Sequence, residues 1–522
     1  MTGARLVLLG LVVAPVPVHA DDHTLSLAEA VKTAIGSDAE LYVAREDARA
    51  AADGVTLAES VFGARLFGEV FATREDQPPS ATSFSATDSR VAGSLGIAGR
   101  IGTGLTYSLS AGVQRHEHDD PFSSVYLPAT TATVRAELIQ PLWRGGFGAA
   151  RQPIVVASLR RSRGEHELRA RIERTVGIVQ SAYWNLVRAR AERDARKSAL
   201  DLAKEQVGES KRLVRLGSGA DLDVVEAETG VGRRNLELLR SEQDIVEAEG
   251  RLFDAIGIRV GDPGWDAQQT IVPSDAAEIE SAPIDLDRSL TLARTKRGEA
   301  LAAHSTVSAE AAELEVTNDR RRPAVDLVLA AGTAGFAGTL AATYATAGVN
   351  GPGLDPPYTT DPAYDGTTRT AFENALGKDL QIFAALRFEI PLGDHEAEVR
   401  HTIQHRVVAR ARLAERDTWS KIDSEVRTAA ARVALDTKVV KAADQAVGLA
   451  EKLLDGTRKR FRAGAGTTFD VLRVSEELTR ARVEAARVRA DYRVAVTRLG
   501  AATGTLLDRF GITVKSLGAS PR

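Results

Sequence analysis

Apolar residues recur at helical spacing over unusually long stretches of this chain. The runs at about 148–215 and 395–462 each cover roughly 68 residues, or about 100 Å of helix at 1.5 Å per residue. Two pairs of shorter runs, each of roughly 35 residues, match them in length when laid end to end. These shorter runs are 26–60 with 222–256, and 286–320 with 468–502. Such lengths exceed the core of a compact domain, so we expect coiled-coil-like packing of antiparallel helices.

In each half, the period changes to two between the first short helix and the long one. Residues 105–113, 133–140 and 381–390 alternate apolar side chains with polar or small ones. One apolar face in segments near ten residues is typical of membrane barrel strands, and equally of a one-sided sheet. The intervening segments 75–89 and 350–368 are rich in Gly, Ser, Thr, Pro and Asp. We therefore favour a barrel with long loops at its rim.

The second half of the chain repeats the first. "KRLVRLGSGADLDVVEA" (211–227) aligns with "RKRFRAGAGTTFDVLRV" (458–474), so a Gly-x-Gly turn and an aspartate at the start of an apolar helix occur twice. "AELIQPLW" (136–143) likewise corresponds to "LRFEIPLG" (386–393). A self-match at half the chain length indicates a tandem duplication.

The duplication sets the predicted organisation. The first repeat covers 21–257, with a helix, strands at about 61–142, the long helix at about 148–215, a turn at 216–221 and a helix at about 222–256. The second covers 284–503, with a helix, strands at about 324–392, the long helix at about 395–462, a turn at 463–467 and a helix at about 468–502. A linker at 258–283 joins the repeats, and a tail follows at 504–522.

An additional hairpin pattern at 91–114 has no counterpart in the second repeat. It could enlarge a barrel, extend a strand or plug the mouth, and the sequence does not choose among these.

The first twenty residues have the features of a secretory signal peptide. Arg5 gives a positive start, residues 6–13 are apolar, and "VHA" (18–20) suits cleavage. We expect a signal peptide over 1–20 and a mature chain that begins near Asp21, outside the cytoplasm. No later stretch approaches the roughly 18 consecutive apolar residues of a membrane-spanning helix.

Composition narrows the chemistry. Among the 522 residues, the formal net charge is −4 and the sequence pI is about 6.2, which gives no electrostatic case for nucleic acid. Cysteine is absent and the initiator is the single methionine, so disulfides, thiolate nucleophiles and Cys-bound metals are excluded. We find no nucleophile elbow, P-loop or paired catalytic carboxylates. The sequence thus predicts neither an enzyme nor a cofactor.

The tandem halves, the Pro-Leu junctions and "FRAGAGTTFDVLRV" (461–474) resemble the TolC-like outer-membrane efflux protein family. The resemblance covers nearly the whole mature chain. It implies an α+β membrane protein: a homotrimer in which each protomer gives about four strands to one twelve-stranded β-barrel, continued by a coiled-coil-like periplasmic tunnel of antiparallel helices. The linker and the tail would form an equatorial belt.

The same resemblance implies an outer-membrane exit duct of a tripartite efflux or type I secretion system. Transport would be passive, driven by an inner-membrane RND or ABC transporter through a periplasmic adaptor, with outer-membrane lipid around the barrel and most of the chain in the periplasm. A periplasmic coiled-coil adaptor or scaffold without a pore is the alternative, which the strands and loops disfavour. The exported cargo is not readable from the sequence.

The two Gly-x-Gly turns would be helix reversals at the periplasmic tip of the tunnel. Glycine permits the positive φ that such a reversal needs, at Gly217 and Gly219 and again at Gly464 and Gly466. Thr467 stands three positions before Asp470, at the spacing of a capping box. Stabilisation of a helix N-terminus is a sufficient explanation for Asp470 and for its counterpart Asp223.

The resemblance implies further roles for the tip residues. Asp470, with Arg473, would line the pore constriction, and both turns would dock the adaptor through Gly217, Gly219, Asp223, Gly464, Gly466 and Thr467. Arg473 stands where relatives often carry a second acid, and it can pair with Asp470 at i, i+3. Phe461 stands where some relatives place a tyrosine that helps to close the tip. Ion preference and gating therefore stay open.

Two histidine groups could suggest metal. His116, His118, Asp119 and Asp120 cluster at a predicted strand end, where a solvated hairpin is the simpler interpretation. His401 and His405 have the i, i+4 spacing of zinc ligands, without the accompanying glutamate. We predict no metal site at either.

Overall fold

The computed structural model describes residues 22–78, 86–118, 126–217, 220–258, 270–279, 284–340, 362–377, 379–390, 392–393, 395–463 and 465–512. The predicted signal peptide and most of the linker lie outside these residues. The chain forms two compact units, one of Met1–Ala48, Glu165–Ala302 and Arg416–Arg522, the other of Arg49–Gly164 and Ala303–Glu415. Each unit takes segments from both repeats.

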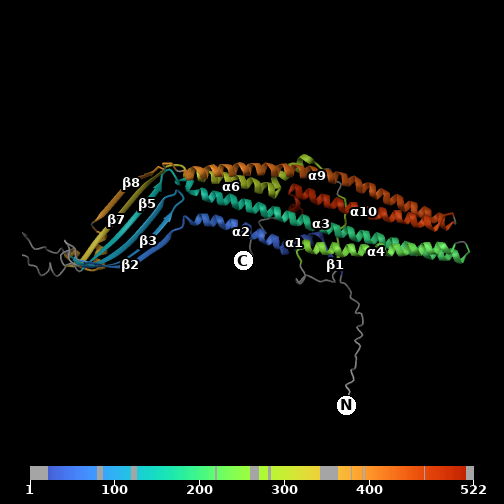
Figure 1. The fold of residues 1–522 in the computed structure, drawn as a ribbon, viewed down its shortest axis with the longest axis horizontal. Coiled ribbons are helices and arrows are strands. Elements are labelled where there is room, and N and C mark those ends of the chain that lie inside the picture. Colours follow the sequence, from blue (N-terminus) through green and yellow to red (C-terminus); the bar gives the residue numbers. More distant parts are fainter. Residues whose placement is uncertain are drawn as a thin grey trace, which may run out of the picture. The chain divides into compact units, whose positions relative to one another are not determined.

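The first unit consists mainly of helices that lie alongside one another (Figure 1). Its elements, four of which continue into the second unit, are α1 (Leu27–Ser37), α2 (Ala39–Ser60), α3 (Gly148–Arg215), α4 (Asp221–Ile256), α5 (Leu286–Lys296), α6 (Gly298–Arg320), α9 (His395–Arg462), α10 (Thr468–Thr503) and α11 (Leu506–Arg509). The short strands β1 (Asp22–Leu25) and β6 (Thr270–Pro273) pair in parallel. Helices α3 and α9 each have 68 residues.

A core of large side chains holds this unit together around the middle of α3. The Tyr183 and Trp184 rings are both buried and meet edge to face, with centroids 5.4 Å apart. The Tyr183 hydroxyl donates to the Asp275 carboxylate (2.7 Å) and accepts from the Asp275 backbone N–H (3.2 Å). Burial and the Asp275 carboxylate raise the pKa of Tyr183 above its ordinary range. The guanidinium of Arg493 from α10 stacks 4.5 Å from the Trp184 ring.

The pattern predicts one helix over 26–60 and one over 286–320, and this prediction is wrong at Asp38 and Arg297. Both residues have extended backbones that separate α1 from α2 and α5 from α6. The Asp38 carboxylate accepts from the Glu40 backbone N–H (2.8 Å), which starts α2, and from the Thr175 hydroxyl (2.9 Å). Contacts made far along the chain thus override local helical periodicity.

The second unit contains one antiparallel sheet of six strands, in the order β2 (Arg65–Gln77), β3 (Ala86–Arg100), β4 (Thr106–His118), β5 (Tyr126–Pro141), β7 (Ala324–Leu340) and β8 (Leu380–Glu389). About four strands are expected from the resemblance, so the described sheet has two more. The additional hairpin at 91–114 forms parts of β3 and β4, which are hydrogen-bonded on both sides. It therefore widens the sheet.

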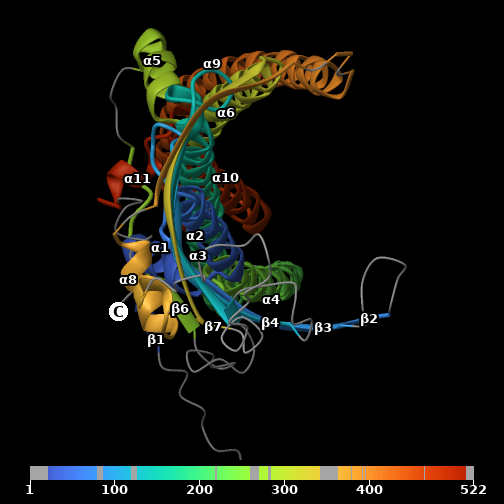
Figure 2. The same cartoon turned by 90° about the vertical axis from the view of Figure 1, so that its left-hand side faces the viewer.

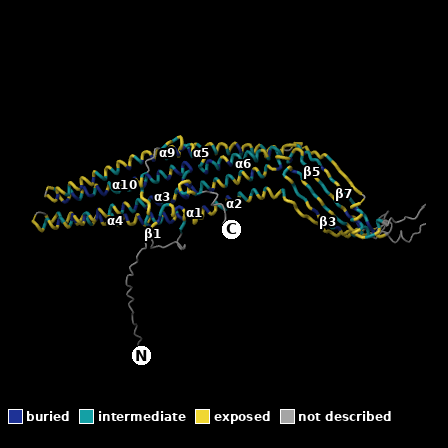
Figure 3. Tube along the Cα trace, turned by 180° about the vertical axis from the view of Figure 1, so that it is seen from behind, coloured by how far each residue is buried: buried dark blue, intermediate teal, exposed yellow. Residues whose placement is uncertain are grey.

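The pairing register sorts the side chains onto two faces. We call one the apolar face: Leu66, Val70, Leu95, Ile97, Leu109, Val113, Val134, Leu138, Leu329, Ile382, Leu386 and Phe388. The other is the polar face: Arg65, Glu69, Asp88, Arg90, Ser110, His116, Arg135, Glu137, Asp326, Arg387 and Glu389. Most of the sheet is exposed or partly exposed (Figure 3).

The short helix α8 (Thr368–Ala375) packs on the apolar face, on the convex side of the curved sheet (Figure 2). Ala371 and Ala375 are buried against Ala132 of β5 and Ala337 of β7. A Cβ on Gly335 would lie 1.9 Å from the Ala371 carbonyl oxygen, so only glycine permits this approach. The Asn374 side chain donates to the Phe336 carbonyl (2.9 Å), which fixes α8 to the sheet.

None of the helices in the described part of the chain has the length and apolar character needed to cross a membrane.

A buried carboxylate makes the stability of the first unit depend on pH. Burial raises the pKa of Glu173 to about 7, although the Arg169 guanidinium (3.1 Å) opposes the shift. Because this pKa lies above that of an unfolded glutamate, the folded chain binds more protons between about pH 4.5 and 7. Stability should therefore fall as pH rises through this window.

Glu173→Gln should remove that dependence, which is on the order of 3 kcal/mol per chain. The measurement is the thermal unfolding midpoint, followed by circular dichroism at pH 5 and pH 8. Glu242→Gln, at an exposed position of α4, is the matched control and should keep the wild-type dependence. Equal pH dependence in wild type and Glu173→Gln would contradict the prediction.

Candidate functional site

The first helix reversal connects α3 to α4. Helix α3 ends with backbone bonds from Leu216 to Arg212 (3.1 Å) and from Gly217 to Val214 (3.0 Å). Gly217 has a φ of 75°, as its predicted role requires. Asp223 accepts from the backbone N–H of Ala220 (3.0 Å), so its carboxylate covers the first turn of α4. Gly219 lies outside the described residues.

The second reversal connects α9 to α10 and is built differently. The Ala465 N–H donates to the Arg460 carbonyl (2.9 Å), and α10 begins at Thr468. Gly466 is not among the residues with positive φ; it lies instead against the backbone of Phe461, 3.4 Å from an added Cβ. Of the two described turn glycines, only Gly217 therefore needs the left-handed conformation. Gly464 lies outside the described residues.

A complete capping box begins α10. The Asp470 N–H donates to the Thr467 hydroxyl (3.1 Å), and the Asp470 carboxylate accepts from both the Thr467 backbone N–H (3.2 Å) and its hydroxyl (2.7 Å). These bonds lower the pKa of Asp470, and the Arg473 and Arg460 charges lower it further through space. The Asp470 carboxylate therefore caps the helix that contains it. The Arg473 side chain is exposed.

The two reversals share one small hydrophobic core. Phe461 is buried with Leu454, Val471, Val474 and Leu478, and Leu213 of α3 packs against them. The hydroxyls of Ser210 and Thr468 lie 3.3 Å apart, and Arg458 pairs with Glu205 (3.1 Å). Phe461 is therefore a core residue that fixes the two tips against each other.

Large apolar side chains that were not predicted from the sequence are exposed beside these turns. Leu216 and Leu222 are each 66% exposed, Phe469 62% and Val225 57%. Leu222 and Phe469 occupy equivalent positions in the two repeats, directly after the first helical residue. That repetition was a signal in the alignment, whereas their exposure required the structure. A groove of about 330 Å³ between α4 and α10 lies next to them, lined by Val225, Phe469, Leu472 and Arg473.

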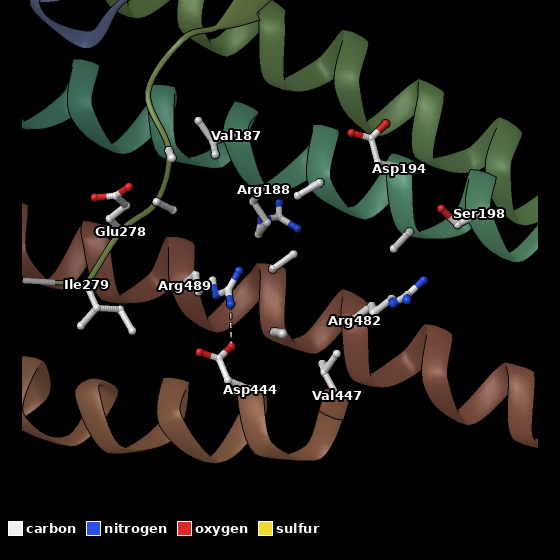
Figure 4. A pocket seen from close by; sticks show the side chains of 16 residues that line it. Val187, Arg188, Asp194, Ser198, Glu278, Ile279, Asp444, Val447, Arg482 and Arg489 are labelled. Atoms are coloured by element: carbon white, nitrogen blue, oxygen red, sulfur yellow. Dashed lines mark hydrogen bonds and ion pairs between the residues drawn. The ribbon is translucent and has the colours of Figure 1, made fainter. Parts of the chain in front are cut away.

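Further along α3, α9 and α10 lies a larger cleft of about 860 Å³ (Figure 4). Its arginines are ion-paired: Arg489 with Asp444 (2.8 Å), Arg482 with Glu451 (2.8 Å) and Arg188 with Glu192 (2.7 Å). Alanines line much of the remainder. Paired charges and alanines leave this cleft without a converging set of polar groups that would bind a ligand.

The structure describes the first candidate metal group only in part. His116 Nε2 lies 2.9 Å from Asp88 on the neighbouring strand, and Asp88 also binds Arg90 (2.9 Å). The His118 side chain, Asp119 and Asp120 lie outside the described residues. Within the described residues, no three His, Cys, Asp or Glu side chains are grouped to hold a metal ion.

The polar face of the sheet carries charges in balanced pairs. Arg135 binds Glu137 on the same strand (2.9 Å), and the Asp88, Arg90 and His116 group lies on β3 and β4. On the apolar face the strands carry exposed aliphatic and aromatic side chains, with the ion pairs Arg74–Asp76 and Arg115–Glu117 only near the loop ends of β2 and β4. A sheet with one hydrated face and one apolar face can separate water from hydrocarbon.

Comparison with known proteins identifies this fold. No protein-family model matches the sequence, and no curated protein matches it. The structure of the outer-membrane channel OprN is similar, with a TM-score of 0.61 at 15% identity over 92% of this chain and 90% of that one. So is the open state of the MtrE outer membrane channel of Neisseria gonorrhoeae, with a TM-score of 0.60 at 13% identity over 93% and 91%.

The outer membrane protein VceC of Vibrio cholerae matches with a TM-score of 0.57 at 17% identity, over 92% of this chain and 96% of that one. Each of these similarities extends over nearly the full length of both compared chains. At the level of the fold, they confirm the resemblance to the TolC-like family that the sequence indicates.

The capping box should make the second tip more stable than the first. Thr467→Ala removes the hydroxyl that caps α10 and should cost about 1 kcal/mol, with faster hydrogen exchange at the amides of residues 468–471. Ala220 occupies the equivalent position in the first repeat and has no capping side chain. Ala220→Thr should therefore slow exchange at the start of α4. Unchanged exchange in both variants would contradict the assignment.

Proposed function

We propose that this protein is the outer-membrane exit duct of a tripartite efflux or type I secretion system. The observation that carries the proposal is the six-stranded sheet with one apolar and one charged face, in a chain that also forms two 68-residue helices. The apolar face would contact outer-membrane lipid and the charged face would line water. The likeness in fold to outer-membrane channels supports this assignment.

In the proposed assembly, three copies enclose the duct and the helices continue it through the periplasm. A periplasmic adaptor would link it to an inner-membrane RND or ABC transporter, which supplies the energy for export. The chain itself would perform no chemistry, so passage through it would be passive.

The helix reversals would be the adaptor-docking surface. The turn residues Gly217, Asp223, Gly466 and Thr467 shape the backbone there, and Leu222 and Phe469 add the exposed apolar surface that a protein partner can bury. Gly219 and Gly464 complete the proposed turns. Because both repeats present a large apolar residue at the equivalent position, one partner can engage the two tips in a similar way.

Asp470 and Arg473 would lie at the pore constriction. Three copies of each around a threefold axis would place both signs of charge at the narrowest point. The capping bonds to Thr467 keep the Asp470 carboxylate ionised, which supports a contribution to ion preference.

Conductance of the purified protein in planar lipid bilayers tests the duct and the constriction together. We expect discrete channel events, and Asp470→Asn should reduce the preference for cations because it removes a negative charge from the constriction. Asp223→Asn is the matched control at the equivalent position of the first repeat and should have less effect. Equal effects of the two variants would reduce Asp470 to a helix cap. Failure of well-folded protein to insert would overturn the duct and favour a scaffold without a pore.

The docking surface is tested by photo-crosslinking in native cells. A photoreactive residue at position 222 or 469 should capture a periplasmic coiled-coil protein, identified by mass spectrometry. The same residue at position 239 is the control, since Leu239 is also exposed (51%) on α4 but away from the turns. Equal capture from all three positions would contradict a docking surface at the tips.

A further inference from the structure

Among the described residues, the sheet of the second unit ends in two strands that are each paired on one side only. β2 pairs with β3, β8 pairs with β7, and these two strands are the ends of the six-strand order. Each therefore presents a row of backbone N–H and C=O groups along its outer side. Such a row needs partners, because a long uncovered edge otherwise pairs with other chains.

The side chains at these edges are also incompletely covered. On the apolar face, Val70 of β2 is 83% exposed and Ile382 of β8 is 77% exposed. Inner-strand residues of the same face are less exposed, from 40% at Leu138 to 59% at Leu95. Both edge strands therefore combine unpaired backbone groups with exposed apolar side chains. In hydrocarbon no water can satisfy the backbone there, so only closure with another strand can.

We infer that β2 of one copy pairs with β8 of a second copy, and that three copies close a wall of eighteen strands. This rests on the proposed function, from which the three copies are taken, and on the six strands of each copy. Because six is even and all neighbours are antiparallel, β2 and β8 of adjacent copies also meet antiparallel. Within one copy, β2 and β8 are the two ends of the sheet order and do not pair with each other in the described residues.

The hairpin formed by β3 and β4 is what makes the wall wide. With about four strands per copy, as the resemblance implies, three copies would give twelve strands. Barrel diameter grows roughly linearly with strand number, so eighteen strands give a lumen about half again as wide. Helix α8 lies on the apolar, convex face and so does not fill this lumen.

Each of the two edge strands that would form the seam carries an exposed phenylalanine. Phe71 of β2 and Phe383 of β8 lie on the polar face, where charged and small residues prevail, and are 44% and 56% exposed. Their positions on the two edge strands bring them to opposite sides of the same seam. Cross-strand aromatic pairing would cover both and add to the backbone bonds.

Because the chain has no cysteine, introduced pairs report on the seam without background. Val70→Cys is combined, one variant at a time, with a cysteine at 380, 382, 384, 386 or 388 of β8, all on the apolar face. Oxidation in membranes should give dimers and trimers on denaturing gels for one pairing register. Val70→Cys with Leu109→Cys, in the inner strand β4, is the control and should remain monomeric. Absence of crosslinks in all five pairs would overturn the seam.

Electron cryo-microscopy of the wild-type protein in lipid nanodiscs counts the strands directly. Eighteen strands in a threefold wall are expected. A conducting threefold assembly with twelve strands would overturn this inference and leave the proposed duct intact. A protein that neither assembles nor conducts would overturn both.

Discussion

The pairing register of the sheet is the constraint on which its other properties depend. A strand shifted by one residue would transfer Val134 and Leu138 to the face of Arg135 and Glu137, and the separation of apolar from charged residues would be lost. The register continues across all six strands, from Leu66 on β2 to Phe388 on β8. The charged groups of the middle strands, such as Arg135 and Glu137, therefore pair on one face, while the other carries aliphatic side chains and helix α8.

The helical unit distributes its stability unevenly along its length. The largest core surrounds Tyr183 and Trp184, where β1, β6 and several helices meet. Towards the reversals the core narrows to a small cluster around Phe461. Regions with fewer buried contacts open at lower free energy than the main core. The parts that would meet a partner are thus the parts that can rearrange without unfolding the whole unit.

Much of this architecture could be predicted from the sequence because its signals are local and long. Helices α3 and α9 cover the ranges that the pattern indicates, since helical periodicity there persists over 68 residues before a Gly-x-Gly turn. The break at Asp38 was not predictable, because Thr175, which holds it, lies 137 positions away. The additional hairpin at 91–114 was visible in the sequence, but its place in the sheet was not predictable, because that depends on pairing with β2 on one side and β5 on the other. The exposure of Phe469 depends on how the helices pack, not on its neighbours in sequence.

In the proposed wall, the position of α8 would affect the surrounding lipid. Its outer surface carries Arg369 and Glu373, exposed and paired at 2.7 Å, at the level where β2 still presents Val70 to the exterior. The height of the apolar band is therefore lower over β5 and β7 than over β2. A bilayer that follows this outline must be thinner beside α8 than beside β2. In a threefold assembly that difference recurs three times around the circumference, so the membrane would meet the protein along a scalloped line.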